Sequence, residues 1–109
     1  ELKHGPISLI ENNTLVLAVA SVPELFEKTM SNVKEVKARG AYVLGLTTQD
    51  KKEEIEKTVD RCLLVPEAYP LFQPSLNVVP LQLFSYYMAL ARGCDVDKPR
   101  NLAKSVTVE

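Results

Sequence analysis

The sequence has 109 residues, 46% of them apolar, and its 13 lysines and arginines nearly balance its 14 aspartates and glutamates. This composition is typical of one globular domain with a modest core, and a formal charge of -1 excludes a global basic field for nucleic acid or an anionic membrane. No apolar run approaches the ~20 residues of a membrane span. We therefore expect neither a nucleic-acid nor a membrane partner.

The two cysteines and the one histidine do not form a metal-binding pattern. Cys62 and Cys94 lie far apart, no CxxC pair occurs, and His4 is the only histidine. The motifs of nucleotide hydrolysis, dinucleotide redox chemistry and zinc hydrolysis are also missing from the sequence. These functions are therefore not the default ones, and we expect no metal site and a reduced cytoplasmic protein with buried thiols. The abrupt, charged start without a methionine favours a fragment of a longer protein.

Three apolar runs predict strands at residues 14–20, 41–48 and 61–66. The first, "TLVLAVA", is continuously β-branched and aliphatic, which is typical of a strand buried on both faces of a parallel sheet. Strands that alternate with helices predict an α/β fold with a doubly wound parallel sheet. Three strands are few for such a sheet, so we expect one bare edge that missing strands or a partner must cover.

The segments between the strands predict helices. In "SVPE" the side chains of Ser21 and Glu24 suit a capping box, and the helix that follows should be amphipathic and end at Gly40. The charged segment 49–59 predicts a second, solvated helix. Four prolines between residues 66 and 80 predict broken turns, and an apolar helix should run from Pro80 to a stop at Gly93, buried against the sheet and against a partner.

Two residues are candidates for chemistry. His4, in "KHGP", lies between a cation and a Gly-Pro turn and is able to take a proton near neutral pH, but from the residues alone a surface loop histidine is the simpler interpretation. Lys104, in "NLAKSV", has a partly apolar setting in which an amine could attack a carbonyl, and the alternative is a solvated terminal lysine. Ser21 and "TTQD" follow strands and could hold a phosphate, but helix capping is the simpler interpretation.

The two ends of the chain carry a resemblance to a known family. "ELKHGP" at the start and "VPLQLFSYYMALARGCDVDKPRNLAKSVTVE" at the end resemble the C-terminal region of the glucosamine-6-phosphate synthases, which are glutamine:fructose-6-phosphate aminotransferases. The ending is long and specific, whereas "ELKHGP" and "PLQL" recur among sugar-isomerase (SIS) domains. The resemblance implies that residues 1–93 are part of a second sugar-isomerase lobe and that residues 94–109 are a C-terminal tail closing the sugar site.

The resemblance also implies an activity. Enzymes of this family make glucosamine 6-phosphate from fructose 6-phosphate and glutamine-derived ammonia, as homodimers and without a cofactor. His4 matches the histidine that assists ring opening in the neighbouring subunit, Lys104 matches the lysine of imine formation, and Ala103 would contact the substrate through its backbone. The family's glutaminase nucleophile, phosphate cradle and proton-transfer glutamate lie upstream. We therefore predict that the chain alone is inactive and needs the missing N-terminal lobes.

Two other functions stay open on the sequence. Sugar-isomerase domains also serve as non-catalytic modules that bind sugar phosphates, and the chain could instead be a dimerisation half-domain. The tail separates the first alternative from the enzyme, because a sensor needs no lysine beside its ligand.

Overall fold

The computed structural model describes residues 2–98, so the predicted roles of Ala103 and Lys104 lie outside the described residues. The described part falls into two units, one up to Asn77 and one from Val78. The predicted boundary between residues 93 and 94 stays a prediction. The elements in chain order are the short 3-10 helices η1 (Leu2–His4) and η2 (Pro6–Leu9), strand β1 (Leu15–Val19), η3 (Pro23–Leu25), helix α1 (Phe26–Ala38), β2 (Tyr42–Thr47), η4 (Gln49–Lys51), α2 (Lys52–Ile55), β3 (Arg61–Leu64) and α3 (Gln73–Ala91).

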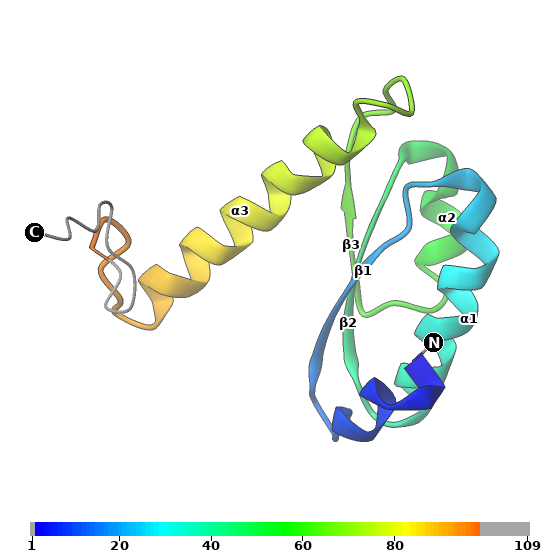
Figure 1. The fold of residues 1–109 in the computed structure, drawn as a ribbon, viewed down its shortest axis with the longest axis horizontal. Coiled ribbons are helices and arrows are strands. Elements are labelled where there is room, and N and C mark those ends of the chain that lie inside the picture. Colours follow the sequence, from blue (N-terminus) through cyan, green and yellow to red (C-terminus); the bar gives the residue numbers. More distant parts are fainter. Residues whose placement is uncertain (1, 99–109) are drawn as a thin grey trace, which may run out of the picture. The chain divides into compact units, whose positions relative to one another are not determined.

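The sheet of the first unit is parallel, as the sequence predicts. Within residues 2–98 it has three strands in the order β1-β2-β3, with Leu15 opposite Tyr42 and Leu44 opposite Arg61. Both helical crossovers, α1 and α2, lie on the same side of the sheet (Figure 1). The outer edge of β1 pairs with no other strand of the described part, so the expectation of a bare edge is confirmed for these residues.

Helix α1 covers the sheet with an apolar face. Phe26, Met30, Val33 and Val36 are buried and share one cluster with buried residues of the strands such as Val43. The β1 side chains that point away from α1 are more exposed than the sequence predicts. Leu15, Leu17 and Val19 are 40–44% exposed, because side chains alternate along a strand and only one set faces α1. The prediction that this strand is buried on both faces is therefore wrong for the described residues.

The start of α1 also differs from the predicted capping box. A 3-10 turn, η3, precedes α1, so the residue before α1 is Leu25 and no side chain caps either helix. Ser21 lies one residue before the N-cap of η3, and its hydroxyl accepts a hydrogen bond from Asn77 instead. The Ser21 hydroxyl therefore takes part in a long-range hydrogen bond, which the local capping motif does not predict.

Two glycines lie at positions where a larger residue would be strained or would clash. Gly40 has a φ of +85°, in the left-handed region that favours glycine, and ends α1 as predicted. Gly45, in the middle of β2, looks like a flaw in a strand, but a Cβ there would meet Ile55 Cδ1 at 2.8 Å and Val59 Cγ1 at 3.0 Å. The glycine therefore lets α2 and the turn after it pack directly on the sheet.

The second predicted helix is shorter than its charge pattern suggests. The segment 49–59 contains η4 and only four residues of α2, and Ile55 is its buried anchor. Its charged face is solvated, as predicted, with ion pairs from Lys51 to Glu54 and from Lys52 to Glu56. The segment needs only one anchored turn to bridge two adjacent strands, so a long helix does not form.

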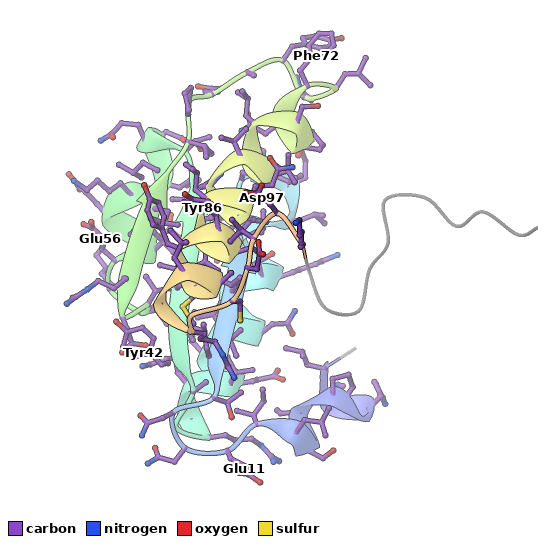
Figure 2. The ribbon with its side chains drawn as sticks, turned by 90° about the vertical axis from the view of Figure 1, so that its left-hand side faces the viewer. Glu11, Tyr42, Glu56, Phe72, Tyr86 and Asp97 are labelled. Atoms are coloured by element: carbon purple, nitrogen blue, oxygen red, sulfur yellow. The ribbon has the colours of Figure 1, made fainter. Side chains whose placement is uncertain are left out.

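Helix α3 begins earlier than predicted. It starts at Gln73 and contains Pro80 in its interior, although the sequence suggested a start at Pro80. Pro74 fits the first turn, and Pro80 removes only one backbone hydrogen bond from a helix of 19 residues. In the second unit, Leu83, Tyr87 and Leu90 are exposed, and the predicted burial of this helix against the sheet and a partner stays a prediction. Figure 2 shows the side chains of this helix around Tyr86, whose ring meets that of Tyr87 edge-on.

The cysteines bear out only part of the expectation for them. Both are free, and Cys62 is half-buried, where desolvation and the neighbouring charge of Glu56 raise the pKa of its thiol. Cys94 is exposed, because it follows the end of α3, so the prediction of a buried thiol is wrong there. Among residues 2–98, no helix combines the length and the apolar character that crossing a membrane demands.

Asp60 fastens the start of β3 to β2 and α1. Its two carboxylate oxygens each accept a hydrogen bond from Lys37 Nζ at 2.8 Å, and one also accepts the amide N–H of Val43 at 2.7 Å. The hydrogen bond from Lys37, followed by that from Val43, lowers the pKa of Asp60 below its ordinary value of 3.8. The ionised carboxylate is thus the form that the fold favours.

We expect this carboxylate to make stability depend on pH. A carboxyl group whose pKa is lower in the folded state contributes stability above its unfolded pKa, and the contribution is lost as the pH falls through the folded pKa. Asp60→Asn should lower the free energy of unfolding at neutral pH and flatten its decline under acid conditions, as urea denaturation at several pH values would measure. Glu53→Gln, on the solvated face of α2, is the control; equal slopes for the wild type and Asp60→Asn would contradict the prediction.

Candidate functional site

The N-terminal segment that carries His4 is held beside α1. Leu2 and Ile10 are partly buried against the core cluster, and the Arg39 guanidinium donates a hydrogen bond to the carbonyl of Ile7 at 3.3 Å. These anchors place η1 and η2 next to α1, towards the end of the sheet where the strands begin (Figure 1). His4 therefore lies on an ordered and anchored turn, and its side chain is exposed.

A polar pocket of about 430 Å³ lies between η1 and α1. From η1 it is lined by Leu2, Lys3 and His4, and from α1 by Lys28, Ser31, Asn32 and Glu35. The α1 residues follow one another at helical spacing and form the polar side of the helix, beside the apolar side that packs on the sheet. The chain's one histidine and two lysines thus meet in a single cavity, which the sequence did not predict.

An apolar groove of about 270 Å³ adjoins this pocket and shares Leu2 and Asn32 with it. The groove runs between β1 and α1, where Val16, Ala18 and Val33 contribute to its walls. Leu2 and Asn32 therefore stand between an apolar surface along the bare edge of β1 and the polar pocket around His4.

The carboxyl end of the sheet carries buried polar groups that bond to one another. Ser21 Oγ accepts a hydrogen bond from Asn77 Nδ2 at 2.7 Å, and Thr47 Oγ1 donates to the carbonyl of Ala20 at 2.8 Å. Thr48 precedes η4 and bonds to Asp50 rather than to the helix amides. Capping explains neither Ser21 nor "TTQD", and their hydrogen bonds serve the protein itself, so the phosphate interpretation gains no support.

Gln73 extends this buried network into the loop before α3. Its Nε2 donates to Asn77 Oδ1 and to the carbonyl of Pro66, both at 3.2 Å, and its Oε1 accepts the amide N–H of Ala68 at 2.9 Å. Sequence reasoning missed both Gln73 and Asn77. The signal was there, since they are the two amide side chains in a segment otherwise rich in apolar residues and proline.

The structure separates the sequence-predicted site residues. His4 lies with the polar face of α1, whereas Ser21 and Thr48 follow the carboxyl ends of β1 and β2. Lys104 and Ala103 lie outside the described residues. Across residues 2–98, no three side chains of His, Cys, Asp or Glu come together as a metal ion would require.

One known domain family matches most of the chain. The model of the SIS domain matches residues 1–92, which is most of the sequence. The chain belongs to the SIS domain family. The three parallel strands, the flanking helices and the "KHGP" turn are therefore features of an SIS domain, and the predicted fold class is confirmed.

Relatives of this SIS chain carry one name. The chain is 55% identical over 109 residues to a glutamine–fructose-6-phosphate aminotransferase (isomerizing) of Clostridium tetani and 55% identical to that of Methanosarcina acetivorans. It is 50% identical to the one of Thermus thermophilus. In each case the whole of this chain matches, but it spans only 18% of the relative's length.

A solved structure agrees with these relatives. The C-terminal domain of the glucosamine-fructose-6-phosphate aminotransferase from Francisella tularensis superimposes with a TM-score of 0.82 and 38% sequence identity. The match covers 91% of this chain and 28% of that domain. The SIS chain thus corresponds to a part of that C-terminal domain, as the ends of its sequence predicted.

Proposed function

We propose that the chain is part of the isomerase region of a glutamine:fructose-6-phosphate aminotransferase, which makes glucosamine 6-phosphate from fructose 6-phosphate and glutamine-derived ammonia. The observation that carries the proposal is the similarity over all 109 residues, at 55% identity, to enzymes of that name. Because the match covers the whole chain, it includes both the "KHGP" turn and the "PRNLAKSVTVE" tail, which carry His4 and Lys104.

His4 and Lys104 have distinct roles in this proposal. Lys104 attacks the C2 carbonyl of the open-chain ketose and forms an imine as water leaves, and the backbone of Ala103 contacts the sugar. His4 assists ring opening by proton transfer. Its anchored turn lies away from the carboxyl end of its own sheet, which supports a role in the site of a second subunit. The proposal therefore includes a homodimer, located in the cytoplasm.

Borohydride trapping tests the role of Lys104. A full-length enzyme that contains this chain, incubated with fructose 6-phosphate and reduced, should carry a stable sugar adduct on the peptide with Lys104, as mass spectrometry would show. Lys104→Met should abolish the adduct, and Lys98→Met, which removes a lysine from the same region, should keep it. If the wild type forms no adduct at Lys104, the proposed function is overturned at its central step.

A further inference from the structure

The N-terminal segment that carries His4 has little core of its own. Neither η1 nor η2, both of which lie within the described residues, contains a buried residue, and Leu9 is 76% exposed. Leu2 and Ile10 are only partly buried, at the margin of the core cluster. Because these apolar contacts are few, the place of the segment beside α1 depends on polar anchors as well.

The end of α1 supplies these polar anchors. Arg39 is the C-cap residue of α1, and its guanidinium donates a hydrogen bond to the carbonyl of Ile7 at 3.3 Å. The next residue, Gly40, accepts the amide N–H of Asn13 through its carbonyl at 2.8 Å. Asn12 packs so closely on Gly40 that a Cβ there would lie 2.7 Å from Asn12 Oδ1. The segment is therefore fixed to the end of α1 at two points, one in η2 and one shortly before β1.

The contact from Arg39 acts on the part of the segment that carries His4. Ile7 lies in η2, three residues after His4 in the sequence. Between these two residues, the carbonyl of Gly5 accepts hydrogen bonds from the amide N–H of Ser8 at 2.9 Å and from the Ser8 hydroxyl at 2.7 Å. These bonds join η2 to the "KHGP" turn, so a displacement of Ile7 also displaces His4.

We propose that Arg39 is a positioning residue for His4: its hydrogen bond to Ile7 holds η2, and with it the "KHGP" turn, where His4 can transfer a proton. The inference rests on the proposed function and adds to it a residue that acts through another. An arginine at the end of a helix also has a common structural use, because its charge opposes the partial negative charge of the helix C-terminus. That use stabilises α1 whether or not His4 is present, so the two roles can be separated by experiment.

Steady-state kinetics of a full-length enzyme that contains this chain test the role of Arg39. Arg39→Ala should lower kcat for glucosamine 6-phosphate formation about tenfold and leave KM within about twofold, because a displaced general acid or base weakens the chemical step and not substrate binding. Arg39→Lys keeps a charged donor and should recover part of the loss. Lys34→Ala removes a positive charge from another exposed position of α1 and should keep the wild-type kcat. Unchanged glutamine hydrolysis and melting temperature would show that the exposed Arg39 is not needed for folding.

A double-mutant cycle with His4→Gln decides whether the loss passes through His4. If it does, Arg39→Ala should change the turnover of the His4→Gln enzyme by less than about twofold, which radiolabelled fructose 6-phosphate makes measurable in these slow variants. A further loss of about tenfold in that background would overturn the inference, because the two effects would then be independent. An Arg39→Ala enzyme with the wild-type kcat would also overturn it, and in both cases the role of His4 would stand. A fully active His4→Gln enzyme would instead remove His4 from the mechanism, and the inference with it.

Discussion

Replacing His4 by glutamine should lower the turnover of fructose 6-phosphate in the full-length enzyme ~10²–10⁴-fold, the usual contribution of a positioned general acid or base. Glutamine keeps a polar side chain of similar reach but cannot exchange a proton near neutral pH. The effect should fall on kcat, since His4 acts in the chemical step, and glutamine hydrolysis should continue. Steady-state rates of glucosamine 6-phosphate and glutamate formation would measure the two activities separately.

Subunit mixing decides which site His4 serves. If His4 acts in the partner's site, His4→Gln and Lys104→Met subunits, each inactive alone, should regain about a quarter of wild-type activity after random exchange, since each mixed dimer holds one complete site. Leu9→Ala, at a 76% exposed position of η2, controls for disturbance of the segment. A mixture that stays inactive would show that His4 acts within its own subunit, and an active His4→Gln enzyme would remove it from the mechanism.

Phe26→Ala should destabilise the first unit by ~3–5 kcal/mol, the usual cost of deleting a buried aromatic ring. Phe26 is 1% exposed and fills the core where α1 begins, and the ammonium of Lys51 lies 4.8 Å from its ring centroid. The substitution removes the ring from the cluster around Met30 and also removes the surface that Lys51 covers. The free energy of unfolding from urea denaturation would give the loss.

The neighbouring residue supplies a matched control for this measurement. Leu25 precedes Phe26 in the chain but is 51% exposed, so Leu25→Ala should change the free energy of unfolding by less than ~1 kcal/mol. Similar losses at the two positions would contradict the assignment of Phe26 to the core and of Leu25 to the surface. Because adjacent residues share the same backbone turn, a difference between them isolates burial.

Several features of the molecule follow from the sequence by itself. Short apolar runs bounded by turns predict the three strands, and the helical spacing of Met30, Val33 and Val36 predicts the buried face of α1, because both patterns repeat within a few residues. The stop at Gly40 follows from its freedom to adopt a positive φ. The two ends of the chain predict the family, since a long and specific motif can be recognised without knowledge of how the chain folds.

Contacts between residues that are far apart in the sequence were decided only by the tertiary structure. Ser21 looked like a helix cap, but Asn77, 56 residues away, occupies its hydroxyl. Gly45 looked like a weak point in a strand, yet its missing side chain makes room for Ile55. The anchoring of η1 beside α1 brings His4 to the same cavity as Lys28, which lies 24 residues further along the chain. Local sequence patterns show which face of a helix or strand is apolar. They do not show which distant segment lies against its polar face, because that depends on how the whole chain packs.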